Sequence, residues 1–213
     1  MNKKIIVSFS ATIILLLLLG FTAIFQMKEL AEISQKIYKH PFTVTNATKS
    51  IDRHLVSMHR YMKDVALAKN NKEIDIAVKY VNDNEKLVYK EFDIIFNRYL
   101  GDKKDITHCY ESFKGWKPIR DEVVFLMKTG KSNNAAEITK EKGAKYLASL
   151  TLQVEKMMKF ANNKALDLQN SALKSEEQSI VLILIMLLAI LIIVVWMLIV
   201  LIRNITENEK KIK

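Results

Sequence analysis

The chain has 213 residues, of which 50% are hydrophobic and 26% charged, with a formal net charge of +10. Five glycines and two prolines make up about 3% of the residues, against a usual share near 12%, so turns must be few and the regular elements long. A β-sandwich, a β-barrel or a doubly wound α/β sheet needs more breaks than that, which leaves an all-α fold. The single cysteine, Cys109, excludes an intrachain disulfide and Cys-rich metal or redox motifs.

Two uncharged apolar segments lie near the ends of the chain, at 5–25 and 180–202. As helices they would span about 31 Å and about 34 Å, enough to cross a bilayer. The first segment is longer than the apolar core of a signal peptide, usually ~7–15 residues, and it ends without a small-x-small cleavage pattern. We therefore expect two transmembrane helices, the first of them an uncleaved anchor.

The short flanks of these segments carry the charges that set orientation. Lys3 and Lys4 precede the first, and four basic residues follow the second: Arg203, Lys210, Lys211 and Lys213. We expect both termini in the cytoplasm, with 1–4 as the N-terminus and 203–213 as the tail, and 26–178 as an extracytoplasmic domain. Basic residues spread singly over helix surfaces are typical of solvated faces, so the positive charge predicts no nucleic-acid partner.

The first helix of the predicted domain continues the first apolar segment to about Ala68, because apolar residues recur every three or four positions. Pro41 interrupts it, and its missing N–H group predicts a kink or a local break. Asn70 and Asn71 predict a turn. A second helix of about 28 residues follows, and we expect Gly101 to end it in the left-handed conformation.

The third helix ends at Gly130, with a bend expected where Gly115 and Pro118 weaken it. Residues 132–134 supply an N-cap for a fourth helix. No turn signal separates this helix from the second apolar segment. The sequence thus predicts an antiparallel up-down-up-down four-helix bundle flanked by two transmembrane helices, because short linkers force neighbouring helices to run antiparallel.

The first and fourth helices are longer than the two between them, so a two-helix stalk should remain beside the membrane. A single helix pair has little core of its own, which favours a homodimer.

Three sequence stretches carry resemblances to known families. His40-Pro41-Phe42-Thr43-Val44-Thr45-Asn46-Ala47, followed by Met58-His59-Arg60-Tyr61-Met62-Lys63-Asp64, resembles the first helix of the four-helix-bundle sensory domain of bacterial methyl-accepting chemotaxis receptors. The same domain occurs on sensor histidine kinases and diguanylate cyclases. Arg203-Asn204-Ile205-Thr206-Glu207-Asn208 is similar to the start of a HAMP linker, with Asn208 in place of the usual proline.

The resemblance implies a chemotaxis-type signal receptor in the bacterial inner membrane, whose sensory domain responds to a ligand or a periplasmic partner protein. The tail after Arg203 is too short for a HAMP, methylation, kinase or cyclase domain. We therefore expect a receptor fragment or a stand-alone sensor. The alternatives are a non-catalytic membrane protein that dimerises with full-length receptors and modulates them, or a fragment of a sensor kinase or cyclase.

Three residues of the first helix are the candidate ligand-binding site. Arg53 and Arg60 are seven residues apart and share a face that Asn46 extends by one heptad. In a chemoreceptor-like dimer, arginines on this face can clamp a small anionic ligand by bidentate hydrogen bonds. The alternative is a solvated arginine face.

Other residues are assigned structural roles. Arg120 lies on the core side of the third helix, where pairing with a carboxylate of a neighbouring helix is favoured over lining a pocket. Cys109 and the methionines are interpreted as core residues. His54 and His59, five residues apart, point in different directions and make poor metal co-ligands. No catalytic motif, metal site or cofactor site is apparent, so we expect no enzyme activity.

Overall fold

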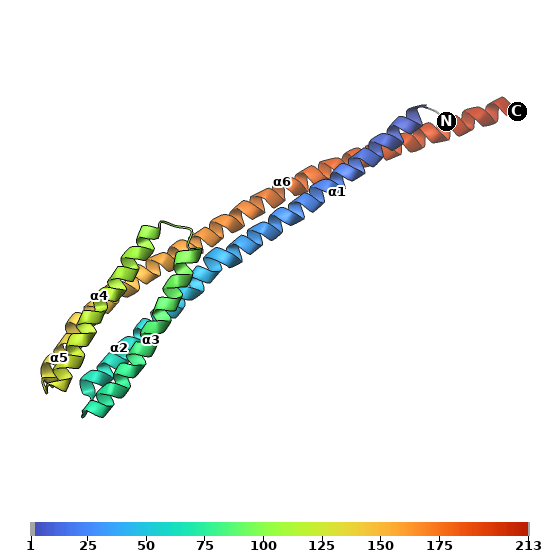
Figure 1. Cartoon of the computed structure of the whole chain (residues 1–213). Helices are drawn as coiled ribbons and strands as arrows, with labels where there is room; N and C mark the ends of the chain where they lie inside the picture. Colours follow the sequence, from blue (N-terminus) through green and yellow to red (C-terminus); the bar gives the residue numbers. More distant parts are fainter. Residues whose placement is uncertain (1–2, 213) are drawn as a thin grey trace. The chain divides into compact units, whose positions relative to one another are not determined.

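The computed structural model describes residues 3–212, with the side chains of 4, 5, 204, 205 and 207–212 outside the description. The proposed N-terminus at 1–4 and the tail at 203–213 therefore lie partly outside the described residues. The chain divides into two compact units (Figure 1). One joins the part of the N-terminal helix up to Ser34 with the part of the C-terminal helix from Leu168, and the other is Gln35–Asp167.

The described residues are almost wholly helical and contain no strand, which confirms the all-α prediction. In chain order the elements are α1 (Lys3–Ile37), the π-helical segment η1 (Tyr38–Phe42), α2 (Thr43–Leu67), α3 (Asn71–Arg98), α4 (Lys103–Lys128), α5 (Ser132–Ile138), the π-helical segment η2 (Thr139–Gly143) and α6 (Ala144–Ile212).

Neighbouring helices of the second unit run antiparallel (Figure 1). Between α3 and the helix formed by η1 and α2, His40 Nδ1 contacts the Arg98 carbonyl oxygen at 2.9 Å and His54 Nδ1 contacts Asn84 Oδ1 at 2.8 Å. Residue numbers therefore rise along one helix where they fall along the other. The same reversal relates α3 to α4 and α4 to the helix formed by α5, η2 and α6. Four helical rods thus form the bundle that the short linkers predict.

One continuous core fills this bundle. The predicted apolar stripes point into it, and Ile51, Leu55, Phe92 and Ile106 have no exposed surface. Aromatic side chains of α3 and α4 pack edge to face in its centre, with ring centroids of Phe92 and Tyr110 5.3 Å apart. Cys109 is 1% exposed, which confirms its interpretation as a small core residue.

Pro41 lies buried inside η1, so the predicted interruption of the first helix is a π-helical bulge. The backbone stays right-handed on both sides, at Ile37 and Thr43. A π-bulge accommodates a residue without an N–H group because the carbonyl groups beside it find other donors. The second bulge, η2, interrupts the fourth helix at Thr139–Gly143, where no interruption was predicted.

Three predicted details of the helix ends are wrong. Gly101 does not adopt a left-handed conformation, because α3 ends earlier through an extended Tyr99, and among residues 3–212 only Gly130 has positive φ, at 77°. Ser132–Asn134 lie inside α5, and the N-cap is Lys131 without a side-chain bond. The turn comes one residue earlier than predicted, since Asn70 caps α3 and Asn71 begins it.

The first unit is a pair of helices, α1 and α6. The less exposed residues of α1 in this unit recur every three or four positions, and several of them are small or polar: Ser8, Thr12, Thr22, Gln26 and Glu29. Most leucines, isoleucines and valines of both helices are exposed in this unit. The described residues contain two helical stretches long and apolar enough to cross a membrane, within Ile6–Leu67 and Ser132–Arg203.

Candidate functional site

The three candidate ligand-binding residues lie on one exposed face of α2. Asn46, Arg53 and Arg60 are all exposed, so the shared face inferred from the seven-residue spacing is real. Arg53 Nη2 donates to Ser50 Oγ at 3.3 Å, and the guanidinium of Arg60 lies 4.8 Å from the centroid of the Tyr61 ring. The grooves described below are lined by other residues.

The same face, followed from the end of η1 along α2, is a longer stripe with few acidic residues. Its exposed members recur every three or four positions and combine basic with apolar side chains: Phe42, Asn46, Lys49, Arg53, Val56, Arg60, Lys63 and Leu67. Val56 is 58% and Leu67 77% exposed. Apolar side chains at helical spacing on an otherwise basic face are typical of a surface that meets a partner.

An open groove of about 410 Å³ lies between α2 and α6. Seven residues line it: Thr48, Lys49, Asp52, Thr151, Val154, Glu155 and Met158. We call it the α2–α6 groove. Asp52 and Glu155 were not among the predicted site residues, because spacing within one helix does not show whether a polar side chain beside the core, such as Asp52 after the fully buried Ile51, lines a groove.

The two carboxylates that line this groove differ in their partners. Glu155 Oε1 pairs with Lys159 Nζ at 2.8 Å, one turn further along α6. Asp52 Oδ1 is buried and has no hydrogen-bond partner. A carboxylate oxygen without a donor costs free energy, although Asp52 as a whole residue is only half-buried.

A second groove, of about 360 Å³, lies between α4 and α6. It is lined by Tyr99, Asp105, His108, Gln153, Lys156, Met157 and Phe160. The rings of Tyr99 and Phe160 pack with centroids 4.9 Å apart and form its apolar wall. Burial, and then the carboxylates of Asp105 and Asp102, raise the pKa of Tyr99 to about 12, so this phenol keeps its proton at neutral pH.

Arg120 lies in the core and lines neither groove. Its Nη2 donates to Glu85 Oε1 at 2.5 Å, and the two side chains are only 5% and 12% exposed. The guanidinium also lies 5.2 Å from the Trp116 ring centroid. The predicted pairing with a carboxylate of a neighbouring helix is thus confirmed, and it holds α4 against α3.

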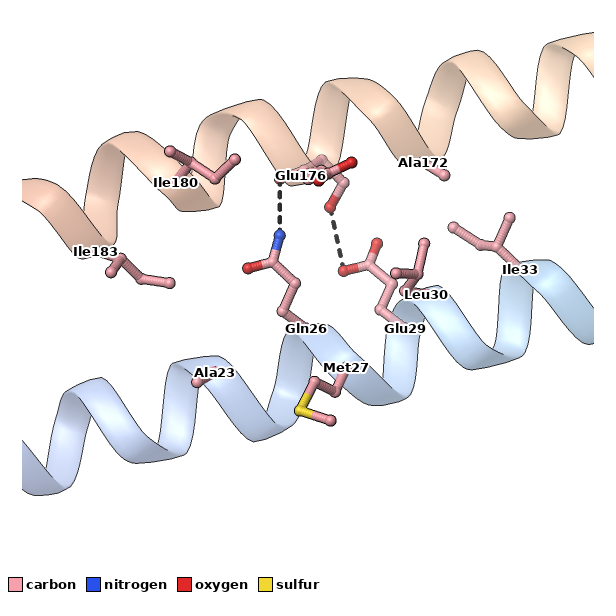
Figure 2. A pocket seen from close by; sticks show the side chains of 11 residues that line it. Ala23, Gln26, Met27, Glu29, Leu30, Ile33, Ala172, Glu176, Ile180 and Ile183 are labelled. Atoms are coloured by element: carbon pink, nitrogen blue, oxygen red, sulfur yellow. Dashed lines mark hydrogen bonds between the residues drawn. The ribbon is translucent and has the colours of Figure 1, made fainter.

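A third groove, of about 280 Å³, lies between α1 and α6 in the first unit (Figure 2). Gln26 Nε2 donates to the Ser175 carbonyl oxygen at 3.3 Å, and Ser175 Oγ donates to Glu29 Oε2 at 3.2 Å. Figure 2 shows Gln26 and Glu29 reaching from α1 towards α6 between apolar residues that include Ala23, Ile33 and Ile180. We call Gln26, Glu29 and Ser175 the polar clasp; it fixes the register of the two helices.

Comparison with known protein families identifies the family of this bundle. Residues 1–175 match the family described as a four helix bundle sensory module for signal transduction. The chain belongs to this family. No curated protein and no solved structure matches the chain significantly.

The family match confirms the resemblance read from the residues around His40–Ala47. In this sensory module the matched region begins with α1 and extends into α6 as far as the polar clasp. The match and the structure together establish a four-helix bundle that serves signal transduction.

Proposed function

We propose that this sensory module is a transmembrane signal receptor of the chemoreceptor type. In this proposal α1 and α6 cross the cytoplasmic membrane of a bacterium, both termini are cytoplasmic, and the bundle faces outward. The observation that carries it is α6 itself, which runs as one helix from Ala144 to Ile212 and so joins bundle core residues to an apolar segment without a turn. Family membership supports the signalling role.

The signal in this proposal is a small displacement of α6 against α1. An unbroken helix transmits a shift or a rotation along its length because its backbone hydrogen bonds are stiff. The polar clasp supplies a register that such a displacement changes, since its hydrogen bonds hold one axial position. A ligand or a periplasmic partner protein that binds the bundle more tightly in one register shifts the equilibrium towards it.

We also propose that the receptor is a homodimer packed through the exposed α2 face. A two-fold axis on this face would bring Lys49, Arg53 and Arg60 of one copy near those of the other. Like charges repel, and an anionic ligand between the arginines would relieve the repulsion while accepting bidentate hydrogen bonds. Arg53, Arg60 and Asn46 are therefore the proposed contacts for a small anion.

The topology is tested by cysteine labelling in intact cells with a membrane-impermeant thiol reagent. In a Cys109→Ala background, we expect Lys90→Cys, on an exposed position of α3, to be labelled from outside. We expect Arg203→Cys to react only after permeabilisation. Labelling of Arg203→Cys in intact cells, or protection of Lys90→Cys, would contradict the proposed topology.

A further inference from the structure

We propose that the groove between α1 and α6, which we call the α1–α6 groove, holds one acyl chain of a membrane phospholipid. This inference rests on the proposed function, because it requires that α1 and α6 cross a bilayer. It assigns a lipid to a surface of the first unit, whereas the proposed anion contacts belong to the second unit.

The α1–α6 groove is mainly apolar. Seven of the eleven residues that line it have apolar side chains, and its volume is about 280 Å³. Figure 2 shows Ala23, Ile180 and Ile183 on one side of the polar clasp and Leu30 and Ile33 on the other. A hydrocarbon chain suits these walls, because burying its methylene groups against apolar side chains is favourable.

The position of the groove along the two helices is the second observation. Ala23 lies within the first apolar segment, 5–25, and Ile180 and Ile183 lie within the second, 180–202. Glu29 and Glu176, which also line the groove, lie a few residues outside these segments. In the proposed topology, one end of the groove is therefore at the depth of the acyl chains and the other is at the depth of the headgroups.

The surface beside the groove is also one that lipid would cover. Phe21 and Phe25 of α1 are exposed, as are Leu182 and Leu184 of α6. Large exposed apolar side chains on both helices are typical of a surface that faces the bilayer. The groove is open, so an acyl chain can enter it sideways from the lipid on this surface.

A second copy of the chain fits the groove less well than a lipid. Glu29 and Glu176 line the groove from facing helices. A two-fold axis at the groove would bring the four carboxylates of two copies together, and like charges that meet at an interface repel. An acyl chain has no charge, so it can occupy the apolar part of the groove without this repulsion.

An occupied groove would shield the polar clasp from water. The hydrogen bonds from Gln26 to the Ser175 carbonyl oxygen and from Ser175 to Glu29 lie along the groove. Hydrogen bonds are stronger where water is excluded. A bound acyl chain would therefore favour the hydrogen-bonded register of α1 and α6, and its departure would favour displacement.

The test uses phosphatidylcholine that carries a photoreactive diazirine on one acyl chain. The full chain is reconstituted in nanodiscs of this lipid, extracted into a mild detergent, freed of loose lipid by gel filtration and then irradiated. We expect one phospholipid to remain on each chain in native mass spectrometry. Its adducts should lie on Ala23, Ile180 or Ile183 and not on the exposed Phe21 or Leu184.

Two variants separate the groove from the rest of the apolar surface. Ala23→Phe should abolish lipid retention, because the added ring fills the groove at the depth of the acyl chains. Leu17→Phe is the matched control, since Leu17 is exposed on the same helix and does not line the groove, and it should retain the lipid. The adduct positions in the parent chain are an independent measurement that needs no variant.

Four results would overturn the inference. These are the absence of retained lipid, adducts confined to the exposed face, undiminished retention by Ala23→Phe, and a lipid-free groove in which Ala23→Cys, in a Cys109→Ala background, forms a disulfide with a second copy. Irradiation before extraction tests the proposed function separately. If lipid then labels both apolar segments but none remains in the groove after extraction, the inference fails and the proposed membrane crossing stands; if neither segment is labelled, the membrane crossing fails as well.

Discussion

At the scale of single residues, the Arg120–Glu85 ion pair is the most consequential polar contact in the core. Both side chains are nearly buried, and α4 supplies one and α3 the other. Removing one partner from a buried pair leaves the other charge without compensation, which costs about 3–5 kcal/mol. We expect Glu85→Ala to lower the free energy of unfolding by that amount in urea denaturation.

The double variant Glu85→Leu/Arg120→Met should recover most of that loss, because neither charge then remains buried. Lys86→Ala is the exposed control: its ion pair with Asp83 is mostly solvated, and its loss should cost less than about 0.5 kcal/mol. A Glu85→Ala protein as stable as the Lys86→Ala control would show that Arg120 is compensated by another group.

Alkaline pH should destabilise the bundle, because the Cys109 thiol and the Tyr99 phenol keep their protons longer in the folded protein than in the unfolded chain. Burial raises the pKa of Cys109 from its ordinary 9.0 to about 12, and burial and nearby carboxylates raise the pKa of Tyr99 from 10.0 to about 12. Above about pH 9 the folded protein then holds protons that the unfolded chain has lost, so the free energy of unfolding falls as pH rises towards 12.

Chemical denaturation between pH 8 and pH 11 measures this slope. Cys109→Ala and Tyr99→Phe should each flatten it, whereas Tyr38→Phe, at a position 69% exposed, should not. If all three variants kept the pH slope of the parent protein, groups other than Cys109 and Tyr99 would be responsible for it.

Residue roles could be predicted from the sequence where they follow from helical spacing. Cys109, Arg120 and the shared face of Arg53 and Arg60 fall into this class, because a 3.6-residue period fixes which side chains point inward. Asp52 and Gln153, each with a buried unpaired oxygen, could not be found this way. Whether a side chain at the border of a core stripe meets a donor depends on the facing helix, which spacing within one helix does not specify.

At the scale of elements, the N-terminus of α3 is held by a reciprocal cap. Asn70 Oδ1 accepts from the Glu73 backbone N–H at 3.0 Å, and Glu73 Oε2 accepts from the Lys69 backbone N–H at 2.8 Å. We expect Asn70→Ala to lower the free energy of unfolding by about 1 kcal/mol, as measured for other N-caps. Asn71→Ala, inside the first turn, is the matched control and should be neutral or stabilising in the same denaturation experiment.

A second element-scale prediction concerns Gly101, in the link between α3 and α4. An added Cβ atom would lie 2.6 Å from Tyr99 Cε1 and 2.8 Å from Phe160 Cε1. Gly101→Ala must therefore move two packed rings and should cost about 1–3 kcal/mol in thermal or urea unfolding. Lys104→Ala, at an exposed position nearby, should change stability little. Equal stability of the two variants would mean that the ring pair moves without cost.

Helix number, order and approximate length could be predicted because apolar periodicity and scarce glycine and proline leave few alternatives. The two π-bulges could not. A bulge shifts the register of a helix by one residue, and the reason for that shift lies in the packing of the neighbouring helices. Pro41 indicates an interruption but not its form, and η2 at Thr139–Gly143 has no proline at all.

In the whole molecule, α6 belongs both to the sensory bundle and to the helix pair with the polar clasp. We expect a variant that carries both Gln26→Cys and Ser175→Cys to form a disulfide readily in native membranes, because the Gln26 side chain donates to the Ser175 carbonyl oxygen in the parent protein. Lys28→Cys with Ser175→Cys is the control pair, because Lys28 is exposed on α1. Equal rates for the two pairs would contradict the register of α1 and α6.

The central claim is that binding to the bundle displaces α6 against α1. Its most direct test is the rate of disulfide formation between Gln26→Cys and Ser175→Cys in the full chain in nanodiscs, with and without a saturating small anion shown by calorimetry to bind. The account predicts a change in rate of at least twofold, because the hydrogen-bonded register is altered. An unchanged rate on fully bound protein would contradict transmission through α6.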